Sequence, residues 1–227
     1  MSSQQPVILF SYASSPYGQK VHLLLTAAGI SYSELPQPAV LPRPDLEALD
    51  ITYRRIPLLA VGRDVYADSS AIIDVILNQL GGKNKVATSK ADKAFEVWGN
   101  DTFASVLPLL PPQAVNDPTF SKDRATIFPI IAKPELLKSL EPTALSGLRS
   151  RLATVEEVFL ADGPYIGGDK LSVADIHVVW VLRWVLIGRL TVVRERNNVE
   201  TDTPLQDWAL RSATQGSISR PSLRSGT

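Results

Sequence analysis

The fold is decided first by residues 7–17, which read VILFSYASSPY. The apolar run at 7–10 is typical of a short strand that is buried on both faces. Ser15 is a favourable cap for a helix N-terminus, and Pro16 suits the first helical position because its φ is fixed and it has no amide hydrogen to leave unpaired. Apolar residues then recur at helical spacing as far as Gly29, which favours a helix end. The stretch therefore predicts a strand followed directly by a helix.

The residues after Gly29 extend this unit. Residues 30–35 alternate between apolar and polar side chains and predict a half-buried strand, which completes a βαβ unit. Four prolines interrupt the loop that follows, because proline lacks an amide donor and restricts the residue before it. A short helix is expected over 44–49, where the proline-rich loop ends.

A hairpin and a helix are expected next. Residues 57–61 read as a strand, and Val65 begins a return strand after a tight turn at Gly62-Arg63 or Arg63-Asp64. The apolar residues between 69 and 80 predict a mostly buried helix. Residues 1–82 are therefore expected to form one α/β domain in the order βαβ-ββα.

The second half of the chain has only helical patterns. After a linker at 81–85, one helix is predicted over 90–107 and another along the apolar face that ends at residue 159. Ser172 and Asp175 are spaced as a capping box, and Leu171 and Ile176 as the hydrophobic staple beside it. Residues 88–190 are therefore expected to form an all-helical domain.

Residues 191–227 differ in character from the rest of the chain. Arg, Ser, Thr, Asn and Gln dominate, and apolar anchors are few. The segment is expected to be a flexible tail with a short helix at 204–210, either as a divergent end or as an incorrectly assigned end of the gene.

Composition excludes several classes of function. The 227 residues carry 23 basic and 23 acidic side chains, so the net charge is +0 and gives no support to nucleic-acid binding. Cysteine is absent, which excludes disulfides, iron–sulfur ligation and a protein thiol in catalysis. Two histidines are too few for a His-rich metal site. Charged residues interrupt the apolar region 173–190, and no signal peptide is evident, so a cytoplasmic protein outside the membrane is expected.

Four short motifs in order carry a family resemblance. Ser15-Pro16-Tyr17, followed by Lys20-Val21, is similar to the Ser-Pro-aromatic helix start of the plant tau class of glutathione transferases, and to the Cys-Pro-Phe start of the omega class with serine for cysteine. Arg55-Ile56-Pro57 resembles the segment before the family's cis proline, and Asp68-Ser69 its acidic-Ser pair. Residues 168–175 resemble the cap of its buried C-terminal helix. The chain resembles a serine-type member of the family, and residues 53–68 resemble those of uncharacterised fungal members.

The resemblance implies an α/β thioredoxin-like domain plus an all-α domain, with glutathione as co-substrate. It implies that Ser15 donates a hydrogen bond to the glutathione sulfur, with Ser14 or Tyr12 as alternates. Ser14 and Ser15 also read as plain helix caps. Trp98 and Phe103 read either as core aromatics or as the lining of an acceptor pocket.

The remaining glutathione contacts are implied in the same way. The amide of Ile56, before a cis Pro57, pairs with the cysteinyl backbone, and Asp68 and Ser69 hold the γ-glutamyl end. Arg55, with Arg43 beside it, is expected at the glycine carboxylate, although Arg43 also reads as a solvated loop charge. His177 reads as a satisfied core residue and His22 as a surface residue.

The function implied is conjugation of glutathione to a hydrophobic electrophilic small molecule, by a detoxifying homodimer. Two alternatives stay open. One is a glutathione-dependent isomerase or lyase of secondary metabolism, and the other is a non-catalytic module for protein association. The absence of cysteine disfavours a thiol transferase.

Overall fold

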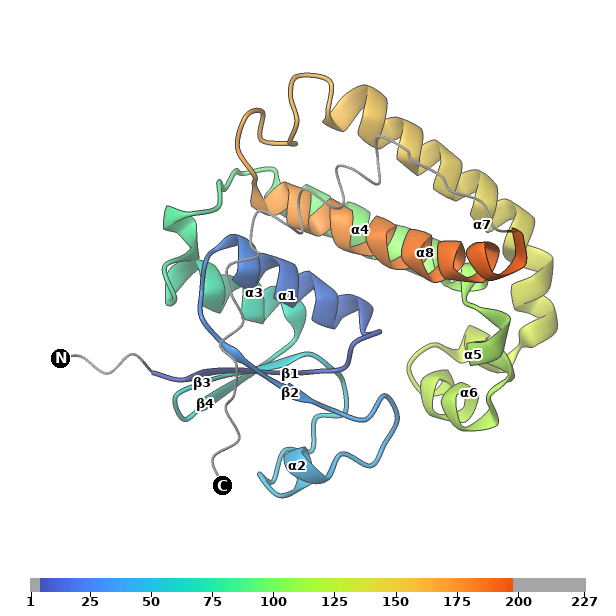
Figure 1. The fold of residues 1–227 in the computed structure, drawn as a ribbon, viewed down its shortest axis with the longest axis horizontal. Coiled ribbons are helices and arrows are strands. Elements are labelled where there is room, and N and C mark those ends of the chain that lie inside the picture. The colour runs from blue at the N-terminus through green and yellow to red at the C-terminus, as the bar shows by residue number, and fades with distance from the viewer. Residues whose placement is uncertain (1–4, 198–227) are drawn as a thin grey trace.

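The computed structural model describes residues 5–197, with side chains up to residue 187. An α/β layer at the N-terminus lies beneath a group of long helices (Figure 1). This arrangement is the predicted one: a four-stranded mixed sheet with its helices, followed by a helical region.

The sheet has four short strands in the order β2-β1-β3-β4. They are β1 (Val7–Ser11), β2 (Ser33–Pro36), β3 (Leu58–Val61) and β4 (Asp64–Ala67). β1 pairs with β2 in parallel and with β3 antiparallel, and β3 and β4 form the predicted hairpin with its turn at Gly62-Arg63. The strand predicted at 30–35 is present as β2 and completes the βαβ unit, but it begins only at Ser33, and all four of its residues are exposed at the edge of the sheet rather than half-buried.

Three helices belong to this domain: α1 (Pro16–Ala27), α2 (Pro44–Glu47) and α3 (Ser69–Asn78). α1 begins at the predicted cap and proline, and it ends just before Gly29, whose φ of 64° is in the left-handed region. α2 lies in the proline-rich loop, as predicted. A 3-10 turn, η1 (Gly82–Asn84), leads from α3 to the helical region.

Up to residue 197, the helical region has five helices and shorter turns. They are α4 (Asp92–Val106), η2 (Leu107–Leu109), α5 (Pro112–Asn116), α6 (Pro118–Ala125), η3 (Pro129–Ala132), α7 (Pro134–Thr154), a π-helical turn η4 (Val155–Phe159) and α8 (Val173–Asn197). Sequence reasoning did not anticipate α5, α6 or the first turns of α7. α8 runs seven residues past the domain boundary predicted at 190, and the predicted helix at 204–210 lies outside the described residues.

The start of α8 is the predicted capping box. Asp175 Oδ2 accepts from the amide of Ser172 at 2.8 Å and from its hydroxyl at 2.6 Å, and the Asp175 amide donates to Ser172 Oγ at 3.3 Å. The second oxygen of Asp175 accepts from the amide of Ile166 at 2.8 Å. The cap therefore also fixes the loop that leads into α8.

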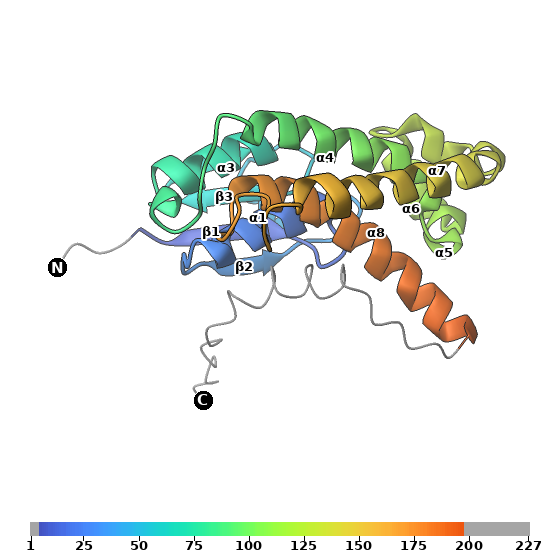
Figure 2. The same ribbon diagram turned by 90° about the horizontal axis from the view of Figure 1, so that it is seen from above.

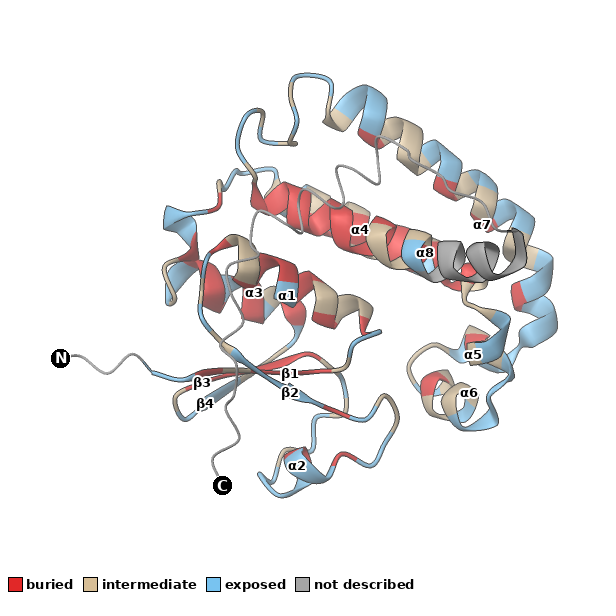
Figure 3. Cartoon of the chain, in the orientation of Figure 1, coloured by how far each residue is buried: buried red, intermediate tan, exposed pale blue. Residues whose placement is uncertain are grey.

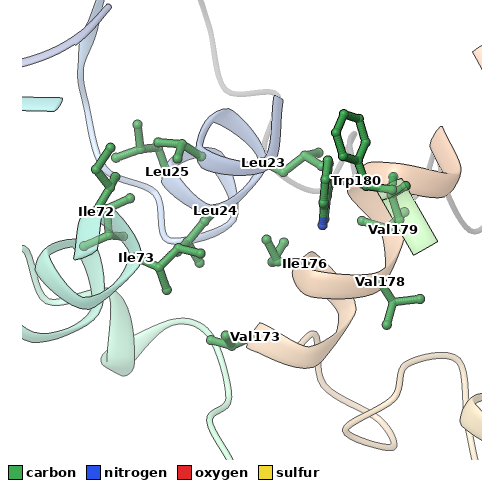
Figure 4. Packing of buried hydrophobic residues seen from close by; sticks show 14 of the residues in the cluster. Leu23, Leu24, Leu25, Ile72, Ile73, Val173, Ile176, Val178, Val179 and Trp180 are labelled. Atoms are coloured by element: carbon green, nitrogen blue, oxygen red, sulfur yellow. The ribbon is translucent and has the colours of Figure 1, made fainter. Parts of the chain in front are cut away.

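One hydrophobic core joins the two domains. α8 packs against both α1 and α4 (Figures 1 and 2). Leu24 of α1, Ile72 of α3 and Ile176 of α8 are all 0% exposed and belong to the same cluster (Figure 4). α4 approaches α8 so closely at Gly99 that a Cβ there would overlap the carbonyl oxygen of His177. Buried residues gather where α1, α3, α4 and α8 face one another (Figure 3).

Candidate functional site

A cavity of about 700 Å³ lies between the α/β domain and the helices. We call its two sides the N-terminal wall and the helical wall. The N-terminal wall consists of residues 12–17, 19, 43, 53–57 and 68–70. The helical wall consists of Asn100, Phe103, Leu107, Leu109, Leu110, Pro111, Ala114, Phe120, Arg124, Ile127, Phe128, Ile131, Trp184, Val185 and Ile187.

Ser15 lies at the N-terminus of α1 and lines the cavity. Its Oγ accepts a hydrogen bond from the amide of Gly18 at 3.1 Å, so the predicted helix cap is confirmed. The side chain is 1% exposed, and the cap uses the hydroxyl only as an acceptor. The hydroxyl hydrogen therefore has no acceptor among the described residues. An added Cβ at Gly18 would overlap the Ser11 hydroxyl and lie 2.9 Å from Cβ of Ser15, so the first turn of α1 packs closely against the end of β1.

The segment before β3 has the predicted cis peptide bond between Ile56 and Pro57. Pro57 is buried, and Arg55 is exposed. Within the described residues, the Ile56 amide donates to no other residue and Arg55 makes no hydrogen bond or ion pair. One backbone donor and one guanidinium are thus both available on the same edge of the cavity.

Asp68 and Ser69 lie where β4 turns into α3. Asp68 caps α3, since its Oδ1 accepts from the amide of Ser70 at 2.8 Å. Its φ of 74° is uncommon for a residue other than glycine. Ser69 is 8% exposed and lines the cavity at the first turn of α3. The structure therefore brings together Ser15, the Ile56-Pro57 segment and Asp68-Ser69 on one wall.

Of the two alternates to Ser15, Ser14 is exposed, and Tyr12 is hydrogen-bonded to Arg124 of the helical wall. The Tyr12 hydroxyl accepts from Nη2 of Arg124 at 3.0 Å, and the Arg124 guanidinium lies 5.7 Å from the centre of the Tyr12 ring. The catalytic role of Ser15, and those of its alternates, stay predictions.

Arg43 lines the cavity but is not the solvated loop charge that was its alternative description. It is 3% exposed and donates to the carbonyl oxygens of Pro38 at 3.1 Å, Ala39 at 3.4 Å and Arg54. The physical reason is that these loop carbonyls lie outside the strands and need donors. Burial is the main cause that lowers the pKa of Arg43. Its contact with glutathione stays a prediction.

The helical wall contains functional candidates that the sequence did not indicate. Phe103 lines the cavity, whereas Trp98 packs edge-on against Phe159 and does not line it. Arg124 of α6 lies on the wall and donates to its neighbour Asp123. No sequence signal marked Asp123 or Arg124, because neither belongs to a motif and their partners lie far away in the chain.

A buried charge group lies behind the cavity, between α1, α4 and α8. Lys20 is 0% exposed, and its Nζ lies 3.8 Å from Glu96 Oε1. Burial lowers the pKa of Lys20 to about 8. Burial alone would raise the pKa of Glu96. Hydrogen bonds from Lys93 and Ser70, together with the charge of Lys20, outweigh the effect of burial and lower the pKa of Glu96 to about 2.

His177 lies beside this group and differs from the prediction that it is a core residue with its hydrogen bonds satisfied. It is a core residue, 3% exposed, but its Nδ1 has no hydrogen-bond partner among the described residues, so it is not the satisfied histidine that was predicted. Burial, and then the charge of Lys20, lowers its pKa to about 3. His22 is exposed, as predicted, and bonds the Tyr32 hydroxyl.

Two negative findings apply to the described part of the chain. No group of three or more histidine, aspartate or glutamate side chains is placed to hold a metal ion. No helix has the length and apolar character needed to cross a membrane.

An α/β domain with a cis proline faces the helical domain across this cavity, and the N-termini of α1 and α3 line it. Residues 9–84 match the family model of the glutathione S-transferase N-terminal domain. Residues 104–211 match a model described as a domain of unknown function (DUF7962). The N-terminal domain is therefore a glutathione S-transferase N-terminal domain, and the chain as a whole has the fold of the solved glutathione transferases. No curated protein sequence matches it significantly.

Solved structures share the fold at low sequence identity. A glutathione S-transferase of Ceriporiopsis subvermispora, in complex with glutathione, matches 96% of this chain and 100% of its own at 16% identity and a TM-score of 0.66. A glutathione transferase of Phanerochaete chrysosporium also covers 96% of this chain and 100% of its own, with 15% sequence identity and a TM-score of 0.65. A tau-class glutathione S-transferase of mango, Mangifera indica, covers 92% of this chain and 89% of its own, with 18% sequence identity and a TM-score of 0.56.

Proposed function

We propose that the chain is a glutathione transferase that joins the glutathione thiolate to an apolar electrophile. The observation that supports this most strongly is that Ser15, Ile56-Pro57 and Asp68-Ser69 line one wall of the same cavity. The opposite wall is mainly apolar and aromatic, which suits the acceptor. Glutathione is named as the bound ligand of the Ceriporiopsis structure, which supports glutathione as the ligand here.

Each part of glutathione has a matching group on the N-terminal wall. The free amide of Ile56 pairs with the backbone of the cysteinyl residue, as an added strand would. Asp68 attracts the γ-glutamyl ammonium, and Ser69 binds its carboxylate at the N-terminus of α3. Arg55 neutralises the glycine carboxylate. Arg43 supports the loop beside it through its three carbonyl contacts.

Ser15 supplies the chemistry in this proposal. A free thiol has a pKa of about 8.5, and lowering it by one unit takes about 1.4 kcal/mol. A hydrogen bond from the Ser15 hydroxyl, together with the N-terminus of α1, is of that order. The sulfur then attacks the electrophilic carbon, the C–S bond forms, and the leaving group departs with its electron pair. The thiol proton passes to solvent, and no cysteine of the chain is needed.

The test is calorimetric titration with glutathione, followed by turnover of chlorodinitrobenzene with mass analysis of the product. Binding at millimolar glutathione or below and a stable conjugate are expected. Glutathione that returns unchanged while an acceptor rearranges would indicate the isomerase or lyase instead. No binding at millimolar glutathione would contradict the proposal and favour the non-catalytic module. We place the reaction in detoxification in the cytoplasm, where glutathione is kept reduced.

A further inference from the structure

Positive charge is in excess on the cavity lining. Of the described residues that line the cavity, four are arginines and one is an aspartate. Arg55 and Asp68 belong to the proposed glutathione site. We call the other three, Arg43, Arg54 and Arg124, the arginine cluster. They come from both walls.

The arginine cluster shares one carboxylate, that of Asp123. Asp123 Oδ1 accepts from Nη2 of Arg54 at 3.0 Å and from the amide of Leu41 at 3.3 Å, and its Oδ2 accepts from Nη1 of Arg124. Both oxygens of Asp123 are therefore used. Three positive charges face one negative charge, and a guanidinium does not give up its proton at neutral pH. Two charges remain without a counter-charge in the cluster.

Donors remain unfilled as well. A guanidinium has five N–H groups, and each member of the cluster makes three hydrogen bonds. Nε of Arg54 is buried and has no partner among the described residues. A buried donor without a partner is costly, so the described residues do not fully satisfy the arginine cluster.

The cluster adjoins the apolar part of the cavity. Arg124 lies on α6, and its guanidinium is 5.2 Å from the ring centre of Phe120, one turn earlier in the same helix. Ile127 and Phe128 follow α6 directly and line the same wall. In Figure 1, α6 lies beside the loop that carries α2, at the end of the helical region away from the start of α8. Charge and apolar surface therefore meet at one place.

We propose that the arginine cluster is a subsite for a carboxylate carried by the apolar acceptor, so that the compounds conjugated are hydrophobic organic acids. This inference rests on the proposed transferase function. The glycine carboxylate of glutathione is the other carboxylate that could bind to the arginine cluster. The acceptor is favoured because Arg55 is free beside Ile56 for the glycine end, whereas Arg124 belongs to the helical wall beside Phe120.

A matched substrate pair tests this: 4-chloro-3,5-dinitrobenzoate and its methyl ester. In both, sulfur replaces chlorine, which leaves as chloride, and only the acid carries a carboxylate. With rates divided by the uncatalysed rate, the wild type is expected to prefer the acid in kcat/KM by about tenfold, the value of one charge-assisted contact. Arg124→Gln and Arg54→Gln are each expected to reduce that preference to below about threefold. Arg149→Gln, an exposed arginine of α7, is the control that keeps it.

Three outcomes would overturn the inference. One is a wild type that treats acid and ester alike. Another is an equal loss on acid and ester in both variants, which indicates a purely structural cluster. The third is a fall in glutathione affinity in the variants as large as their fall in kcat/KM for the acid. This result would mean that the cluster binds the glycine carboxylate of glutathione. Should Arg124→Gln unfold, Arg54→Gln decides, because its side chain is one-third exposed.

A second measurement separates this inference from the proposed function. Calorimetry with 4-phenylbutyrate and its methyl ester needs no turnover. Tighter binding of the acid, lost in Arg54→Gln, supports the subsite even if no conjugate forms, in which case only the transferase function fails. Equal binding of acid and ester while chlorodinitrobenzene is conjugated overturns the subsite and leaves the transferase function intact.

Discussion

The two walls of the cavity are built from the sequence in different ways. On the N-terminal wall, Ser15 and Asp68 each cap the helix that begins at the next residue, and Ile56 precedes its own proline. The side-chain hydrogen bonds that form the two caps each span three residues or fewer. Where the helical wall meets it, Arg54 of the N-terminal wall reaches Asp123 across 69 positions, and Arg124 of the helical wall reaches Tyr12 across 112. The proposed glutathione half of the site is therefore local, and the proposed acceptor half depends on how the domains dock.

The largest expected effect is on the anchoring of the helical wall. Asp175 is 0% exposed and accepts three hydrogen bonds at 2.6–2.8 Å, which fix the start of α8. Asp175→Ala leaves the amides of Ile166 and Ser172 without acceptors in the interior, so the free energy of unfolding is expected to fall by about 3 kcal/mol. Urea denaturation followed by circular dichroism measures this.

The matched control for this substitution is Asp169→Ala, at an exposed position in the same loop. It is expected to stay within about 0.5 kcal/mol of the wild type. Equal stability of the two variants would mean that the cap does not hold α8, and hence that the helical wall is anchored elsewhere.

The next effect is on the N-terminal wall. Ser15→Ala removes a donor to the thiolate, so kcat with chlorodinitrobenzene is expected to fall by about tenfold to a hundredfold. Glutathione affinity is expected to change by less than about threefold, since the other contacts remain. Steady-state kinetics and calorimetry give the two numbers. Ser14→Ala is the paired variant, and a larger loss there than at Ser15 would transfer the role to Ser14.

The same contrast explains how far the sequence could predict the site. The caps and the hairpin are encoded by neighbouring residues, and the cis proline was expected from the family resemblance, so the α/β domain and its wall could be predicted. α5 and α6 could not, because they are short and lie among prolines that read as helix ends. The burial of Arg43 was missed because its partners are backbone carbonyls, which no side-chain pattern reveals.

A smaller effect is expected at the contact between the walls. Asp123→Asn keeps the shape of the side chain but removes the charge shared by Arg54 and Arg124. Unpaired guanidiniums then repel one another, and the free energy of unfolding is expected to fall by about 1–2 kcal/mol at low salt. Because salt screens the repulsion, the deficit is expected to shrink at 0.5 M NaCl. Thermal denaturation at both salt concentrations measures it, with Asp162→Asn, at an exposed position, as the control. A deficit that does not depend on salt would contradict the charge argument.

The smallest effect at neutral pH concerns Lys20, which lies behind both walls. Its pKa is about 8 in the folded chain against an ordinary 10.5, because burial penalises the charge. Between these values the unfolded chain binds the extra proton, so stability is expected to rise as pH increases from about 8 toward 10.5. Lys20→Met fills the same space and is expected to abolish this rise. At pH 7 the stability of the variant is expected to lie within about 1 kcal/mol of the wild type, because losing the ion pair with Glu96 offsets the gain from no longer burying a charge. Denaturant unfolding of both proteins from pH 7 to 10 tests the difference between them. Two parallel pH profiles would mean that Lys20 keeps an ordinary pKa, and hence that water reaches the group where α1 meets α4.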